Sequence, residues 1–188
     1  PESPTMAIEW FEEKPEGMII EDLGIWRRTI VGLENPIHAT FFELLLFTGF
    51  RKTEALTLEW KNVREDRIHL PKTKNGRSFE LPILQLHHEI LAPVRGLHQK
   101  WVFPSPKGPD GRLSEPKRLE WSPHAHRRTF ATVAGEAGVL EEVVGRFLNH
   151  TPLSITGQRY VKPSLDALRP AMQTVCAELE GRSNSNYP

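Results

Sequence analysis

The sequence predicts a single α+β domain that is mainly α-helical and carries a small three-stranded antiparallel sheet. Apolar residues recur at helical spacing through most of the chain, whereas β signals are confined to about residues 58–82. A chain of 188 residues can also bury one sizeable core. We expect residues 20–181 to form the domain. Residues 1–19 are expected to be a linker or the remnant of a missing N-terminal region, and residues 182–188 a flexible tail.

Three helices are predicted before the sheet. The first covers about residues 20–33 and has apolar residues at helical spacing, namely Leu23, Trp26, Ile30 and Leu33. Asn35 and Pro36 then supply an N-cap and a first-turn proline for a second helix, which is apolar enough to be buried. Gly49 should end it, and a short third helix follows over residues 51–58.

Three short segments carry the β signal: LTLEWKNVRED, RIHLPKT and RSFELPI. The turns between them are marked by Glu65-Asp66 and by Asn75-Gly76, and Asn-Gly is a strong signal for a tight hairpin. Residues 95–122 are rich in loop signals and should be exposed. Further helices are predicted over about residues 84–94, 124–138, 140–149, 152–160 and 164–180.

Composition excludes a few classes of protein. Lysine plus arginine and aspartate plus glutamate number 24 each, so the formal net charge is zero. A neutral balance neither predicts nor excludes a nucleic-acid partner, because a local basic face decides that question. The single cysteine, Cys176, excludes an internal disulfide framework and a Cys-rich metal site. No apolar run approaches the roughly 20 residues of a membrane helix, and we expect a cytoplasmic, nucleoid-associated protein without membrane contacts.

The motif TGFRKTEAL contains the first candidate for chemistry. Arg51 stands at the start of a predicted helix just after a glycine turn, and Glu54 lies three residues on, on the same helix face. The carboxylate can therefore orient the guanidinium. An ordinary ion pair on a helix surface has the same spacing.

The predicted hairpin tip contains the second candidate, Lys74, directly before Asn75-Gly76. Such a tip can reach into a nucleic-acid groove, and a lysine near a leaving oxygen can donate a proton as a general acid. Lys72 and Arg77 make the same loop basic. A solvated loop lysine fits the pattern equally.

The stretch from Pro123 to Lys162 contains the remaining candidates. His124 and Arg127 are three apart on a predicted helix, and arginine is the best side chain for gripping a phosphate. His150 precedes Tyr160 by ten residues, and a tyrosine hydroxyl can act as a nucleophile once its proton is taken. A helix cap, a buried histidine and a packing tyrosine are the alternatives.

A metal site is not predicted in this stretch. His124 and His126 point to different sides of a helix, and no further ligand of the HExxH type follows them.

Taken in order, these residues resemble the catalytic domain of tyrosine recombinases, the phage-integrase family. TGFRKTE is similar to the first box of that family, TGxRxxE, and Lys74 to its hairpin lysine; HAHRRTFAT is similar to its HxxR box and LNHTPLSITGQRYV to its histidine-to-tyrosine stretch. The resemblance covers about residues 20–175. The chain departs from the family at Ala125-His126, where Asp-Leu is frequent, and at Asn149, which replaces a glycine but also tolerates left-handed backbone geometry.

The resemblance implies the tyrosine recombinase catalytic-domain fold and a site-specific recombinase (an integrase) that cleaves and rejoins DNA strands. Tyr160 would attack a phosphodiester, form a 3′-phosphotyrosyl link and release a 5′-hydroxyl. Arg51 and Arg127 would hold the two non-bridging oxygens, and His150 would add a third donor.

The same resemblance implies that two further residues transfer protons. Lys74 would protonate the leaving 5′ oxygen, and His124 would assist Tyr160, whose ordinary pKa is about 10. Glu54 would orient Arg51. Because the arginines and the lysine supply positive charge, no metal or other cofactor is expected.

The implied partner is a double-stranded DNA recombination site, and the full-length protein is expected to form a tetramer on it. Lys72, Arg77 and Arg128 are further candidates for DNA contacts. The last predicted helix carries an apolar stripe that fits either of two roles, docking on a neighbouring subunit, as in the family, or packing on its own domain. The stripe consists of Leu165, Leu168, Met172, Val175 and Leu179.

Two other functions share these features. A type IB topoisomerase has a similar residue set and the same 3′-phosphotyrosyl chemistry, but relaxes supercoils as a monomer. A DNA-binding module of the same fold without activity is the second alternative. The presence of Tyr160 and both arginines argues against it.

Overall fold

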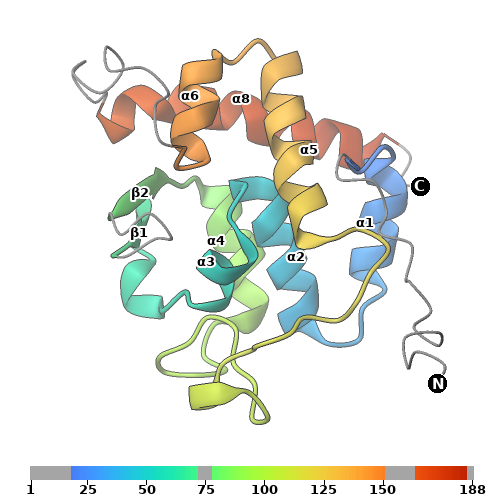
Figure 1. The fold of residues 1–188 in the computed structure, drawn as a ribbon, viewed down its shortest axis with the longest axis vertical. Helices are drawn as coiled ribbons and strands as arrows, with labels where there is room; N and C mark the ends of the chain where they lie inside the picture. Colours follow the sequence, from blue (N-terminus) through green and yellow to red (C-terminus); the bar gives the residue numbers. More distant parts are fainter. Residues whose placement is uncertain (1–17, 72–77, 151–163, 186–188) are drawn as a thin grey trace, which may run out of the picture.

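The computed structural model describes residues 18–71, 78–150 and 164–185 (Figure 1). The described part is mainly helical with one small antiparallel sheet, which confirms the predicted fold class. The helix predicted over 152–160 lies outside the described residues, as do Lys72, Lys74, Arg77 and Tyr160. The helices are α1 (Leu23–Val31), α2 (Pro36–Thr48), α3 (Lys52–Leu56), α4 (Gln85–Leu91), α5 (Pro123–Glu136), α6 (Glu141–Phe147) and α8 (Leu165–Asn184). The strands are β1 (Arg67–Leu70) and β2 (Phe79–Pro82), and short 3-10 turns are η1 (Trp60–Asn62), η2 (Ala92–Val94) and η3 (Pro109–Gly111).

Helix α2 lies at the centre of the domain, between α5 and α4 (Figure 1). Both predicted end signals are confirmed. The Asn35 side chain accepts a hydrogen bond from the Ile37 amide at 2.9 Å, with Pro36 as the first helical residue. Gly49 ends the helix in the left-handed conformation, at φ 65°. Nearly every side chain from Thr40 to Thr48 is buried, so this helix forms the middle of the core.

The prediction of a three-stranded sheet is wrong for one strand. β1 and β2 pair antiparallel, from Arg67 opposite Pro82 to Leu70 opposite Phe79, but no third strand joins them within the described residues. The first predicted strand, over residues 58–66, instead makes a 3-10 turn flanked by isolated bridges. Its backbone turns toward residues 100–102, because the Trp60 amide donates to the Lys100 carbonyl and the Val102 amide donates to the Leu58 carbonyl.

Helix α8 packs on its own domain. Of the two roles considered for its apolar stripe, this structure shows the packing within the domain. It contacts α1, α5 and β2, and Leu168, Met172, Val175 and Leu179 are buried while Leu165 is half-buried. The helix also runs beyond the predicted end, to Asn184, and so includes the first residues assigned to a flexible tail. Arg182 holds this last turn through ion pairs with Glu136 and Glu178.

A buried histidine joins α1 to α5. The Trp26 indole donates to His126 Nε2 at 2.9 Å, so the ring proton must be on Nδ1, which lies 2.9 Å from the Ser122 carbonyl oxygen and donates to it. The ring also stacks on Phe42, with centroids 5.2 Å apart. His126, inside the HxxR motif, is therefore a neutral ring with both nitrogens hydrogen-bonded.

A second buried histidine has the opposite tautomer. His87 Nδ1 accepts from the Leu84 amide at 3.0 Å, so Nε2 carries the proton and donates to the Phe47 carbonyl, near the end of α2, at 3.0 Å. Burial lowers the pKa of both His87 and His126 to about 4. Both rings are therefore neutral at pH 7.

The free energy of unfolding should fall as the pH drops from 7 to 5. In this range the unfolded chain binds protons at His87 and His126 that the folded chain refuses, because the folded-state pKa values lie below the ordinary 6.5. The expected loss is about 2 kcal/mol for each histidine. Urea denaturation at a series of pH values measures it.

The variant His126→Leu separates this histidine from other titrating groups, including Glu43, whose pKa is raised by burial and which acts in the opposite sense. This variant should reduce the pH dependence of the free energy of unfolding by the contribution of one histidine. It should also lower stability at pH 7, because the Trp26 indole loses its acceptor. An unchanged pH dependence would contradict the assignment.

Candidate active site

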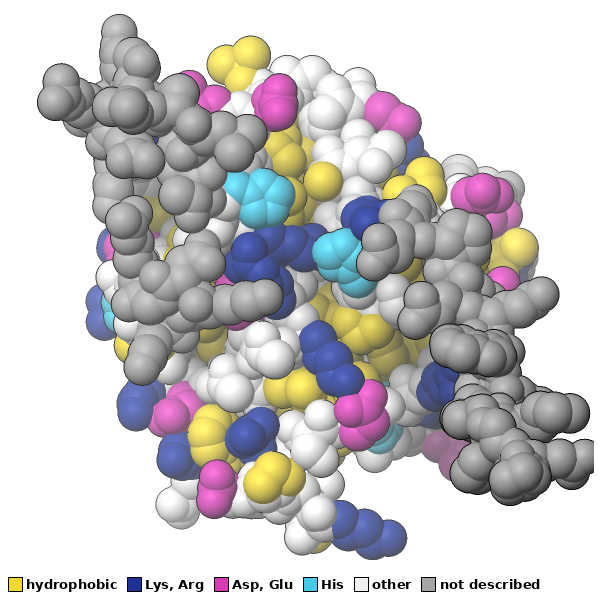
Figure 2. All heavy atoms as spheres, in the orientation of Figure 1, with side chains coloured by type: hydrophobic (Ala, Val, Ile, Leu, Met, Phe, Trp, Pro, Cys, Tyr) yellow, Lys and Arg dark blue, Asp and Glu magenta, His cyan; other side chains and the backbone are white. Residues whose placement is uncertain are grey.

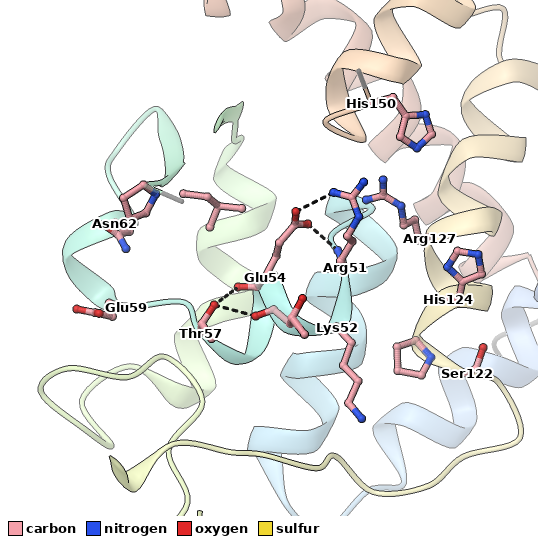
Figure 3. Close-up of a pocket in the computed structure, with 14 residues that line it drawn as sticks. Arg51, Lys52, Glu54, Thr57, Glu59, Asn62, Ser122, His124, Arg127 and His150 are labelled. Carbon is pink, nitrogen blue, oxygen red and sulfur yellow. Dashed lines mark hydrogen bonds and ion pairs between the residues drawn. The ribbon is translucent and has the colours of Figure 1, made fainter. Parts of the chain in front are cut away.

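A cleft of about 1170 Å³ opens between α3, the end of β1 and the first half of α5. Figure 2 shows lysine or arginine side chains at the centre of this face with histidines beside them, and Figure 3 shows the lining residues. They are Arg51, Lys52, Thr53, Glu54, Thr57, Glu59, Asn62, Leu70, Pro71, Ser122, Pro123, His124, Arg127 and His150. Four of the six predicted catalytic residues therefore meet in one cleft.

Arg51 is the residue that begins α3, and Glu54 fixes it. One carboxylate oxygen of Glu54 accepts from the Arg51 backbone amide at 2.8 Å, and the other accepts from the guanidinium Nη1 at 2.9 Å. The Glu54 side chain is only 6 % exposed, so this pair is held rigidly. The predicted contact is formed, and it turns the guanidinium toward Arg127 (Figure 3).

Arg127 reaches the cleft from the inside of α5 and is 6 % exposed. Its Nη1 donates to the Gly49 carbonyl at 2.6 Å and its Nη2 to the Leu148 carbonyl at 2.5 Å. Burial, and then repulsion by Arg51, lower the pKa of Arg127 to about 10, while Glu54 opposes that shift. The side chain stays charged at neutral pH, and these two hydrogen bonds use two of its five N–H groups.

Two features require glycine at position 49. Its φ of 65° belongs to the left-handed region, which strains most residues that have a side chain. A Cβ there would also lie 2.7 Å from Leu148 Cδ2 and 2.8 Å from Phe130 Cδ1. A larger residue would therefore push α2, α5 and the end of α6 apart.

His150 stands at the cleft because of the way α6 ends. Its amide donates to the Gly145 carbonyl at 2.8 Å, and the Asn149 amide donates to the Arg146 carbonyl at 3.0 Å, which together form a Schellman motif. Asn149 has φ 50°, in the left-handed region that asparagine tolerates. Partial burial, followed by the charges of Arg127 and Arg51, lowers the pKa of His150.

Of the other predicted site residues, one lines the cleft, one does not, and four lie outside the described residues. His124 lies in the first turn of α5 on the cleft side (Figure 3), and Arg128, one residue past Arg127, is half-buried and not among the described lining residues. Lys72, Lys74, Arg77 and Tyr160 lie outside the described residues. Pro71 and His150, the residues at which the described chain stops before segments 72–77 and 151–163, both line the cleft.

Sequence reasoning missed several lining residues, among them Lys52, Glu59, Asn62 and Ser122. Only Lys52 carried a signal, its position beside Arg51. In the described residues, no group of three or more His, Cys, Asp or Glu side chains is placed to hold a metal ion. None of the helices seen in the described ranges is long and apolar enough to cross a membrane.

Comparison with known proteins identifies the family to which this fold and this cleft belong. The pattern of the Phage integrase family matches residues 32–166, which is most of the chain. The chain therefore belongs to the phage integrase family.

Two curated relatives are integrases. The prophage integrase IntF of Escherichia coli (strain K12) is 26% identical over 168 residues, which cover 79% of this chain and 36% of that protein. The integrase of Salmonella phage P22 is 25% identical over 121 residues, covering 61% of this chain and 28% of that protein. The chain thus spans about a third of the length of these relatives.

Solved structures share the fold. The integrase from mycobacterium phage Brujita has a TM-score of 0.62 at 18% identity, covering 86% of this chain and 60% of that chain. The XerH site-specific recombinase bound to palindromic difH substrate has a TM-score of 0.58 at 20% identity, covering 84% and 52%. The Tn1549 transposon integrase in complex with circular intermediate DNA has a TM-score of 0.55 at 18% identity, covering 86% and 66%.

Gly49→Ala should destabilise the chain by about 2 to 4 kcal/mol, because it adds backbone strain to steric overlap with Leu148 and Phe130. Gly96→Ala is a matched control, since Gly96 has φ 86° but nothing within 4 Å of its would-be Cβ. That control should lose only about 1 kcal/mol. Urea denaturation measures both, and equal losses would show that packing at Gly49 is unimportant.

Proposed function

We propose that this chain is the catalytic domain of a site-specific DNA recombinase that works through a 3′-phosphotyrosyl intermediate. The observation that best supports it is the meeting of Arg51 and Arg127 in one cleft, with His124 and His150 beside them. The family, and the structures of similar recombinases bound to DNA, support double-stranded DNA as the partner.

The charge arrangement suits a phosphodiester. Arg51 and Arg127 repel one another, and Glu54, which pairs with Arg51, only partly offsets this repulsion at Arg127. A second negative charge between the guanidinium groups would relieve that repulsion. The donors left on each arginine can take one non-bridging oxygen apiece, and planar guanidinium groups suit such oxygens well. Charge that develops on the phosphorus oxygens in the transition state would be stabilised in the same way.

His150 has the role of a neutral donor in this proposal. Its lowered pKa keeps the imidazole uncharged at neutral pH, so it adds a hydrogen bond to a phosphate oxygen without adding to the repulsion of the arginines.

The strand-cleavage step is a transesterification. The Tyr160 oxygen attacks phosphorus as its proton passes to His124, and the bond from phosphorus to the 5′ oxygen breaks. Lys74 donates a proton to that oxygen, which leaves as a 5′-hydroxyl. A 5′-hydroxyl from another strand reverses the step and completes the exchange. Arg51, Arg127 and Lys74 supply the positive charge, so the reaction requires no metal or other cofactor.

The full-length protein would act as a tetramer on a duplex recombination site, in the cytoplasm and associated with the nucleoid. Lys72, Arg77 and Arg128 would add contacts to the DNA backbone, which carries most of the affinity in such complexes.

Tyr160→Phe should abolish formation of a covalent protein–DNA adduct, because phenylalanine has no oxygen to attack phosphorus. The assay incubates the protein with a nicked suicide duplex carrying its recombination site and separates the adduct on a denaturing gel. Wild type should trap an adduct. An adduct that persists in the variant would refute Tyr160 as the nucleophile, and relaxation of any supercoiled plasmid without site preference would favour the topoisomerase alternative.

Arg127→Lys should slow adduct formation by about 100-fold or more, because a point charge cannot replace a fork that holds two carbonyls and a phosphate. Arg128→Lys is the matched control on the same helix, and its cleavage rate on bound DNA should stay near wild type. Circular dichroism checks that both variants fold. Equal rates in the two variants would argue against a role of Arg127 at the phosphate.

A further inference from the structure

Lys52 lines the cleft but has no part in the proposed reaction. It follows Arg51 directly, yet the two side chains diverge: Arg51 turns to Arg127, while Lys52 points away, toward the segment that leads into α5 (Figure 3). Its Nζ lies 2.6 and 2.7 Å from the two carboxylate oxygens of Glu115. The two neighbours are thus aimed at different positions along one cleft.

Lys52 lines the cleft, and its ion pair with Glu115 is open to solvent. The Glu115 side chain is 75 % exposed and that of Lys52 is 34 % exposed. Exposed ion pairs add little to stability, because water competes for both charges. The lysine can therefore exchange its carboxylate for another anion at small cost.

The neighbouring carboxylates do not offer an alternative partner for this lysine. Glu54 is engaged by Arg51, and Glu59 by Lys61 at 2.7 Å. The Glu115 carboxylate joins the 95–122 connection to α3 through Lys52, which lies 63 residues away in the sequence. An anionic polymer lying in the cleft would meet Lys52 and Glu115 together, attracted by the first and repelled by the second.

We propose, resting on the recombinase function above, that Lys52 binds a DNA phosphate next to the one held by Arg51 and Arg127. Glu115 competes with the DNA for this lysine and so weakens binding. The exchange forms no covalent bond: the ammonium leaves the carboxylate for a phosphate oxygen, and the carboxylate returns to water.

Binding to a fluorescein-labelled duplex of mixed sequence tests the proposal, with all variants made in a Tyr160→Phe background so that no covalent adduct forms. Lys52→Met should weaken binding about five- to tenfold near 0.1 M salt and reduce the slope of log K against log salt by about 0.9, the loss of one phosphate contact. Lys52→Arg should retain both values. Glu115→Gln should tighten binding.

The double variant separates exchange from simple charge repulsion. If Glu115 acts by holding Lys52, Glu115→Gln should lose most of its effect once Lys52→Met is present. Additive effects, or weaker binding in both single variants with a shared loss of stability, would overturn the proposal. Thermal unfolding of each variant provides the stability values.

The outcomes also distinguish this proposal from the function on which it rests. A parent chain that does not bind the duplex at all would count against the recombinase function. A parent chain that binds, with Lys52→Met unchanged in affinity and slope, would refute the role of Lys52 alone.

Discussion

The geometry of the cleft depends on two hydrogen bonds made by the guanidinium of Arg127. It donates to the carbonyls of Gly49 and Leu148, which cap α2 and α6, so one side chain of α5 holds two helix ends. Those carbonyls carry the partial negative charge of helix C-termini, which favours a buried cation. The segment with Arg51 begins two residues after the first carbonyl, and His150 lies two residues after the second. The same contact therefore positions three of the cleft's donors.

The positive charge of the cleft is a local property, because the chain as a whole has a formal net charge of zero. Arg51 has a buried carboxylate partner, whereas Arg127 donates hydrogen bonds to two neutral carbonyls. Two close guanidinium groups with one carboxylate leave an excess of positive charge that an anion can balance. The lowered pKa of His150 follows from the same excess. A neutral chain can in this way present a cationic cleft.

The sequence predicted those parts of the fold that depend on neighbouring residues. Asn35 with Pro36, and Gly49, mark the ends of α2, because caps and left-handed glycines act within one helical turn. The contact of Glu54 with Arg51 was predictable for the same reason. The strand predicted over 58–66 did not form because its first half pairs with residues 100–102, on a segment whose signals predicted only a loop. Its second half joins β1 only through an isolated bridge between Val63 and Ile68.

By itself, then, the sequence determined the approximate positions of the helices in the described residues and the set of residues that identifies the family. Each of these depends on local backbone energetics or on residue type in order. Only the tertiary structure decided that Arg127 binds two helix ends, that His126 is a neutral ring held by Trp26, and that Lys52 is held by Glu115. These contacts join residues from 21 to 100 positions apart. Long-range packing brings such partners together, and burial, not spacing, sets their protonation and charge.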